Sequence, residues 1–186
     1  MAKLGMAKPP AAKRVALLFS ADQIARRVDT LARGIAACDL RDVLIVSVLK
    51  GSFIFAADLI RALHRHGLEP QIEFLFLGSY GAGTKGGAVK VLRDVESEIE
   101  GRDVIIVDDI LDSGRTLVFA KQRLAARGAR SVRACILLDK RGRRTEDVAV
   151  DFTGFECPNQ FVVGYGMDLA HRYRELPFIG VIVTEA

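Results

Sequence analysis

The chain has 186 residues, of which 50% are apolar and 27% charged, so it is long enough for one buried core and too apolar to be disordered as a whole. The net charge of +4 is compatible with phosphate-bearing ligands, but Lys and Arg are scattered rather than gathered on one helix, so we expect no nucleic-acid partner. No apolar run is long enough to cross a membrane, and residues 1–14 lack the apolar core of a secretory signal. We therefore expect a cytoplasmic protein with no membrane partner.

The cysteines and histidines show no metal-binding pattern. Cys38, Cys135 and Cys157 are odd in number and widely spaced, without a Cys-x-x-Cys pair or a histidine at ligand spacing, so we expect reduced thiols. His64, His66 and His171 stand in no supporting motif. We expect them on the surface.

Helical and strand patterns alternate along the chain after a frayed tail over residues 1–14, and we expect residues 15–186 to form one domain. Residues 20–23, Ser-Ala-Asp-Gln, have the form of a helix capping box. The patterns predict helices at 21–37, 53–64 and 117–127, and strands at 43–49, 72–77, 90–94, 104–107, 132–138, 161–165 and 178–183.

This alternation predicts an α/β fold, with a mostly parallel, doubly wound sheet and flanking helices. Residues 154–175 lack clear periodicity. We expect them, with the N-terminal segment, to form a small cap, or hood, over the carboxyl ends of the strands.

Residues 104–116 carry the most informative pattern. Four β-branched residues precede Asp108, Asp109 and Asp112, and a Ser-Gly-Arg-Thr turn then leads into a predicted helix. Such a strand-to-helix turn is where an open α/β sheet binds anions. Three carboxylates would repel a phosphate, so they must face ribose hydroxyls, a metal or a proton. The pattern suggests a sugar phosphate ligand.

Residues 81–86 match the dinucleotide-binding pattern Gly-x-Gly-x-x-Gly, but the sequence that follows argues against that function. A Rossmann turn must open a helix, whereas residues 87–91 continue as an extended segment. The four glycines between Ser79 and Gly87 indicate either a mobile loop that closes over a ligand or a plain hairpin.

The pattern at 104–116 resembles the signature of the type I phosphoribosyltransferases, which bind 5-phosphoribosyl pyrophosphate. Further segments resemble the hypoxanthine-guanine branch of that family, at residues 49–52, 79–80, 139–140, 152–158, 161–168 and 173–177. The resemblance covers residues from about 40 to the C-terminus. It implies a purine salvage enzyme, a homodimer or homotetramer, that transfers the phosphoribosyl group to hypoxanthine or guanine with Mg²⁺, giving IMP or GMP and pyrophosphate.

Carried over to the matching positions, the resemblance also implies residue roles. Asp112 would be the catalytic group that accepts the proton from purine N7. The phosphoribosyl and pyrophosphate groups would be bound by Lys50, Gly51, Ser79, Tyr80, Asp108, Asp109, Ser113, Gly114, Arg115, Thr116 and Arg174. The purine would be bound by Lys140, Phe161, Val162 and Asp168, and Mg²⁺ by Asp108, Asp109 and Asp168.

Two details of the resemblance concern single positions. It implies a non-proline cis peptide between Leu49 and Lys50. The family more often has Glu where this chain has Asp108, so the carboxylate here reaches one methylene less far.

Two other functions are compatible with the sequence. One is a phosphoribosyltransferase that prefers xanthine. The other is a regulatory protein of the same fold that binds nucleotides and RNA without turnover. Finding Asp112 together with Lys50, Lys140 and Arg174 favours an enzyme, because a sensor needs no proton acceptor.

Overall fold

The computed structural model describes residues 13–79 and 89–184, and these residues build a central six-stranded sheet. Its strands lie in the order β4-β3-β2-β5-β6-β7, and all neighbours are parallel except β3 and β4. The strands are β2 (Leu44–Leu49), β3 (Gln71–Ser79), β4 (Val89–Arg93), β5 (Asp103–Leu111), β6 (Ser131–Asp139) and β7 (Phe152–Glu156). The predicted α/β fold with a mostly parallel sheet is confirmed.

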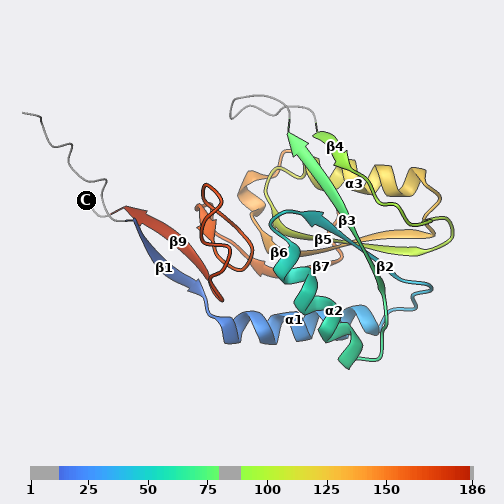
Figure 1. Ribbon diagram of the computed structural model, residues 1–186, viewed down its shortest axis with the longest axis horizontal. Helices are drawn as coiled ribbons and strands as arrows, with labels where there is room; N and C mark the ends of the chain where they lie inside the picture. The colour runs from blue at the N-terminus through green and yellow to red at the C-terminus, as the bar shows by residue number, and fades with distance from the viewer. Residues whose placement is uncertain (1–12, 80–88, 185–186) are drawn as a thin grey trace, which may run out of the picture.

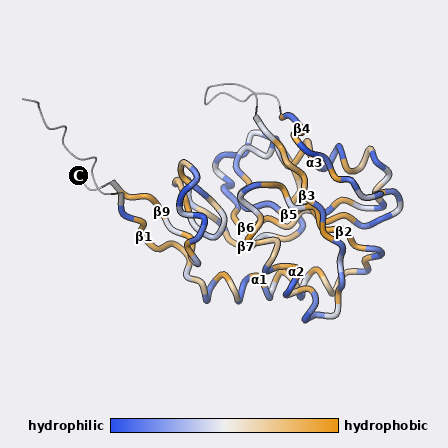
Figure 2. The backbone as a smooth tube through the Cα atoms, in the orientation of Figure 1, coloured by the Kyte–Doolittle hydropathy of each residue, from blue (hydrophilic) through white to orange (hydrophobic). Residues whose placement is uncertain are grey.

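Helices cover both faces of this sheet (Figure 1). Helices α1 (Ala21–Ala36) and α2 (Phe53–Arg65) pack together on one face, and α3 (Arg115–Ala126) lies on the other. Side chains of the central strand β5 alternate between the two cores: Ile105 and Val107 pack with α1 and α2, and Val104 and Ile106 pack with α3. The central strands therefore bury apolar side chains on both faces. Figure 2 shows long hydrophobic stretches along these strands.

The first helix begins as its sequence predicts. The Ser20 side chain accepts a hydrogen bond from the Gln23 backbone N–H, and the Gln23 side chain accepts one from the Ser20 N–H. The apolar positions at helical spacing, Ile24, Val28 and Ile35, are all buried.

A second, three-stranded sheet joins distant parts of the chain. It has the order β1-β9-β8 and consists of β1 (Lys13–Phe19), β8 (Val162–Val163) and β9 (Ile179–Thr184). Strands β1 and β9 extend away from the central sheet as an antiparallel pair (Figure 1). Lys13 and Arg14, which we expected in the frayed tail, belong to β1 because they pair with Thr184 and Val183. Residues 1–12 lie outside the described part.

Three further elements differ from the expectations. Strand β5 runs four residues beyond the predicted 104–107, to Leu111, so Asp108 and Asp109 lie inside it rather than after it. Residues 154–156, expected in the cap, belong to β7, which pairs with β6 at the edge of the central sheet. A short 3-10 helix, Arg141–Arg143, follows β6.

The cysteines are free, with Cys135 and Cys157 buried and Cys38 half-buried. His64 and His171 are exposed, whereas His66 is half-buried and bonds the Asp29 carboxylate at 3.0 Å. Within residues 13–79 and 89–184, the longest apolar helical stretch falls short of what crossing a membrane requires.

Candidate active site

Asp108 and Asp109 lie near the carboxyl end of β5, in the middle of the sheet. Alternation along the strand points them to opposite faces, with Asp109 on the face that α2 covers. Asp108 is buried, and its Oδ1 accepts a hydrogen bond from the Asp109 backbone N–H at 3.0 Å. Burial, together with repulsion from Asp109, raises the pKa of Asp108 well above its ordinary value. Burial also raises the pKa of Asp109, and the nearby Arg174 partly offsets that rise.

The loop between β2 and α2 packs against Asp109. The peptide between Leu49 and Lys50 is cis, which confirms the expectation. A Cβ on Gly51 would overlap the Asp109 carboxylate, and a Cβ on Gly166, where φ is +99°, would overlap the Gly51 carbonyl oxygen. Two glycines therefore allow two loops to stack over this carboxylate.

A compartment of about 290 Å³ opens beside these residues. Its polar groups are acidic at the strand end and basic on the loop. It is lined by Val48, Leu49, Lys50, Gly51, Leu77, Gly78, Val89, Asp108, Asp109, Ile110 and Thr116. Such a surface suits a ligand with both hydroxyl and anionic groups.

The turn at 113–116 leads from β5 into α3. Gly114 has φ +89°, and the Ser113 carbonyl accepts hydrogen bonds from the Thr145 and Glu146 N–H groups, which fixes the turn. Gly114, the N-cap of α3, has no side chain that could cap the helix, and the Arg115 N–H donates to Ser113 Oγ at 3.5 Å. The next N–H groups of the first turn, those of Thr116 and Leu117, are available to an anion, and the helix dipole favours negative charge there. The Arg115 side chain turns to Glu146, at 3.7 Å.

A second compartment, of about 430 Å³, adjoins the first and shares Asp109 and Ile110 with it. Its volume lies within the usual range of small-molecule sites. It is lined by Asp109, Ile110, Asp112, Lys140, Arg143, Asn159, Gln160, Phe161, Val162, Met167 and Asp168. Lys140 is only 7% exposed, and none of the ion pairs among the described residues includes it, whereas Phe161 is 55% exposed.

Two carboxylates of the second compartment are paired with arginines. The Oδ1 of Asp112 is inaccessible to solvent and accepts no regular hydrogen bond within the described chain, yet Arg143 Nε lies 2.9 Å from it. The Oδ1 of Asp168 lies 2.6 Å from an Arg174 nitrogen, and its Oδ2 accepts from the His171 N–H at 2.8 Å. Arg174 also donates to the Gly166 carbonyl at 2.5 Å.

The structure therefore brings most of the sequence-predicted residues to one edge of the sheet, in two groups. Tyr80, the Ser79 side chain and the glycine-rich segment 81–87 lie outside the described residues. Asp168 lies in the second compartment, and no cluster of three potential metal ligands occurs in residues 13–79 and 89–184.

Sequence reasoning missed Arg143, Asn159 and Gly166. The run Arg141-Gly142-Arg143-Arg144, placed directly after Lys140 at a parallel strand end, was a usable signal for the first of these.

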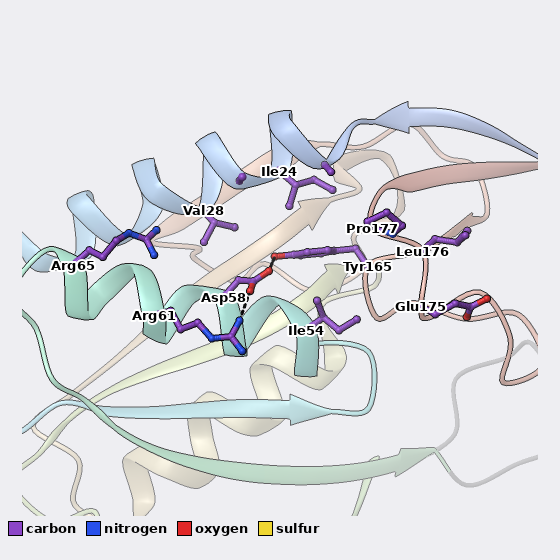
Figure 3. Close-up of a pocket in the computed structure, with 12 residues that line it drawn as sticks. Ile24, Val28, Ile54, Asp58, Arg61, Arg65, Tyr165, Glu175, Leu176 and Pro177 are labelled. Atoms are coloured by element: carbon purple, nitrogen blue, oxygen red, sulfur yellow. Dashed lines mark hydrogen bonds and ion pairs between the residues drawn. The ribbon is translucent and has the colours of Figure 1, made fainter.

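A larger cavity of about 470 Å³ lies between α1, α2 and the segment near Pro177 (Figure 3). Ile24, Val28 and Ile54 form its apolar wall, and the Tyr165 hydroxyl donates to the Asp58 carboxylate at 2.7 Å. Burial raises the pKa of Tyr165, so its hydroxyl stays protonated. None of the sequence-predicted site residues lines this cavity. The candidate active site is therefore the pair of compartments at the strand ends.

The chain is similar to known proteins over most of its length. Residues 18–169 match the phosphoribosyl transferase domain family. The hypoxanthine-guanine phosphoribosyltransferase of Mycobacterium avium is 43% identical over 174 residues, which cover 89% of this chain and 84% of the relative. That of Dictyostelium discoideum is 38% identical, covering 91% and 96%.

Solved structures of hypoxanthine phosphoribosyltransferases are also similar to this chain. A variant of Trypanosoma cruzi hypoxanthine phosphoribosyltransferase, in a ternary complex with substrates, superposes with a TM-score of 0.84 at 37% identity, covering 93% of this chain and 96% of the other. The Staphylococcus aureus enzyme superposes with a TM-score of 0.84 at 34% identity, covering 90% of each chain. The chain belongs to the phosphoribosyltransferase family and, within it, to the hypoxanthine-guanine phosphoribosyltransferases.

Proposed function

We propose that this protein transfers the 5-phosphoribosyl group of phosphoribosyl pyrophosphate to hypoxanthine or guanine, giving IMP or GMP and pyrophosphate. The observation that carries the proposal is the pair of compartments that meet at Asp109 and Ile110. One compartment suits a charged sugar phosphate, and the other suits a flat base. The bond that forms in the reaction joins a sugar to a base, so the two substrates must meet at such a junction.

In the first compartment we assign the 5′-phosphate to the turn at 113–116. The backbone N–H groups and the Thr116 hydroxyl would donate to it, aided by the α3 dipole. Asp108 and Asp109 would hold the ribose hydroxyls, and Lys50, Gly51 and Arg174 the pyrophosphate. In the described chain Arg174 is held by Asp168 and Gly166, which orients its guanidinium near Asp109.

The second compartment would hold the purine. The buried Lys140 ammonium would donate to the 6-oxygen, Phe161 would stack on the ring, and Val162 and Asp168 would contact the opposite edge. An amino group at position 6, as in adenine, offers Lys140 no acceptor and leaves a buried cation unpaired. The site should therefore reject adenine.

The chemical step breaks the bond from C1′ to the pyrophosphate oxygen, which leaves with the electron pair. Purine N9 forms the new bond to C1′, and the N7 proton passes to the Asp112 carboxylate. The buried Oδ1 of Asp112, which accepts no regular hydrogen bond from the described residues, is a suitable acceptor. Removing this proton makes N9 a better nucleophile as positive charge grows on the ribosyl ring.

The first compartment also fits Mg²⁺. Asp108 is buried and the adjacent Asp109 half-buried, both with raised pKa values, so a cation would stabilise their charged forms. Mg²⁺ is usually held by one or two carboxylates together with substrate oxygens. When bound, it would neutralise charge on the departing pyrophosphate. Asp168 as a further ligand stays a prediction, because both of its oxygens already contact Arg174 and His171.

The test is a product assay with phosphoribosyl pyrophosphate and Mg²⁺, in which hypoxanthine, guanine, xanthine and adenine are supplied separately. We expect nucleotide from hypoxanthine or guanine and none from adenine. Product from xanthine alone would favour the xanthine-preferring alternative, and no product from any base would contradict the proposal. We further propose that the protein is cytoplasmic. We also propose that it forms a homodimer or homotetramer, and sedimentation analysis of the purified protein would test this oligomeric state.

A further inference from the structure

Arg143 lines the second compartment, which would hold the purine and is called the base compartment below. It lies in the 3-10 turn that follows Lys140, and its Nε is 2.9 Å from Asp112 Oδ1. Its Nη1 is 3.5 Å from the Asn159 Oδ1, in the segment that leads to Phe161. The guanidinium therefore spans the compartment from the carboxylate on one side to the Asn159 segment on the other.

The neighbouring arginines of the same turn have a different environment. Arg144 pairs with the buried Asp139 at 2.7 Å, and Arg141 reaches Asp139 at 3.5 Å and Glu156 at 3.0 Å. Those contacts hold the turn against β6 and β7. Arg143 instead contacts Asp112, so its role differs from that of a turn-stabilising cation.

The contact between Arg143 and Asp112 involves the oxygen that would receive the purine proton. Asp112 Oδ1 accepts no regular hydrogen bond in the described structure, although Arg143 Nε is within reach. The purine N7–H and the Arg143 guanidinium both need this oxygen. The purine and Arg143 therefore compete for Asp112 Oδ1.

We propose that Arg143 is a positioning residue that serves as the counter-ion of Asp112 in the absence of base and closes the base compartment until the purine displaces it. The inference rests on the proposed function, because it takes Asp112 as the N7 acceptor. The same arrangement recurs at a second carboxylate of the compartment, Asp168, whose counter-ion is Arg174 at 2.6 Å. With Asp112 and Asp168 each paired with an arginine, neither of these two carboxylates carries uncompensated negative charge in the base-free site.

The size of the effect follows from exposure. The side chains of Arg143 and Asp112 are 53% and 45% exposed, so solvent screens the pair and displacing Arg143 costs little. We expect a two- to fivefold effect on the affinity for base, which corresponds to about 0.4–1 kcal/mol. A purine that also contacts Lys140 and Phe161 readily outweighs a contact of this size.

The test compares Arg143→Gln with the matched control Arg141→Gln, which removes the same charge from the same turn. In Arg143→Gln the KM for hypoxanthine should fall two- to fivefold, with kcat not reduced and the KM for phosphoribosyl pyrophosphate unchanged. Arg141→Gln should leave all three constants as in the unmodified protein. Thermal melting of both variants checks that the fold is retained.

A double-variant cycle separates this mechanism from a general effect of charge. In the Asp112→Asn background the ion pair is already absent, so adding Arg143→Gln should leave the KM for hypoxanthine unchanged. Chemistry is slow in that background, so KM there approaches the dissociation constant.

Three results would overturn the inference: an unchanged KM in Arg143→Gln, a raised KM, or the same fall in the Asp112→Asn background. A raised KM would make Arg143 a direct contact of the bound base. If the unmodified protein forms no nucleotide from any base, the proposed function itself fails, and this outcome is distinct from turnover with an unaltered KM.

Discussion

The carboxylate of Asp109 lies against the backbone of Gly51, so close that any side chain at position 51 would overlap Oδ2. The carbonyl oxygen of Gly51 is in turn covered by Gly166, which leaves no room for a Cβ there either. Because neither glycine has a side chain, three segments pack directly against one another: the end of β5, the loop at residues 49–51 and the loop around Gly166. This stack places Lys50 and Asp109 in one compartment.

Gly51→Ala should therefore damage substrate binding more than folding. The added methyl group displaces either Asp109 or the loop, so we expect the KM for phosphoribosyl pyrophosphate to rise at least tenfold in steady-state assays. Gly34→Ala is the control, because a Cβ there meets Phe152 only at an ordinary 3.9 Å, within helix α1. That variant should keep full activity and gain about 0.5–1 kcal/mol of stability. Normal substrate constants in Gly51→Ala would contradict the packing argument.

Lys140→Met should lower kcat/KM for hypoxanthine and guanine about 10- to 150-fold, the usual range for a lost hydrogen bond to a charged group. The KM for phosphoribosyl pyrophosphate should change little, because Lys140 lines only the second compartment. Lys121→Met removes a lysine that pairs with Asp151, away from the site, and should have no kinetic effect. If Lys140→Met lowered kcat/KM only for phosphoribosyl pyrophosphate and left kcat/KM for both bases unchanged, Lys140 would not be a contact of the base.

Asp108→Asn should stabilise the unliganded protein while lowering its activity. Burial and the neighbouring Asp109 make the charged form of Asp108 costly, and Asn keeps the shape while removing the charge. We expect a higher melting temperature at pH 7 and the loss of the extra stabilisation that Mg²⁺ gives with phosphoribosyl pyrophosphate. Asp147→Asn, which alters an exposed carboxylate, serves as the control. A lower melting temperature for Asp108→Asn would mean that the charge of Asp108 beside Asp109 does not destabilise the unliganded protein.

Asp94, which lines neither compartment, allows a test of how the free energy of unfolding depends on pH. Its carboxylate accepts from Arg123 of α3 at 3.0 Å, and this hydrogen bond, the largest cause, lowers the pKa of Asp94. A lowered pKa means that the stabilisation is present above the unfolded value of about 3.9 and is lost as pH falls through the folded value. Asp94→Asn should cost about 1 kcal/mol at pH 7 in urea unfolding, and the cost should shrink between about pH 5 and pH 3.

The exposed Glu96 is the control for that experiment. Its pair with Arg93 is 2.8 Å long but largely solvated, so Glu96→Gln should change the free energy of unfolding negligibly at any pH. A cost for Asp94→Asn that stays constant from pH 7 to pH 3 would show that the carboxylate charge is not what matters.

The sequence predicted the layered α/β fold because periodicity reports directly on burial. The run at 104–107 is apolar on both faces, and the capping box at Ser20 ends a strand and starts a helix by local hydrogen bonds alone. Strand β7 was not found, because Gly154 interrupts its pattern and its backbone lies close to the Leu137 carbonyl, a contact set by tertiary packing.

The site was predictable where it depends on strand ends, and unpredictable where it depends on loops. Asp108, Asp109 and the turn at 113–116 follow from one continuous segment. Gly166 joins the site only when a distant segment folds onto this one. For Arg143, the basic run after Lys140 marks the turn but does not show which of its three arginines contacts Asp112. A spatial arrangement was needed to identify them.

The most direct test of the central claim is nucleotide formation from phosphoribosyl pyrophosphate and hypoxanthine by the unmodified protein and by Asp112→Asn. If Asp112 accepts the N7 proton in the second compartment, kcat should fall about 10²- to 10⁴-fold in the variant, while the KM for phosphoribosyl pyrophosphate stays within a few fold. An unchanged kcat in Asp112→Asn would contradict the assignment of the proton acceptor, and with it the chemistry proposed for this site.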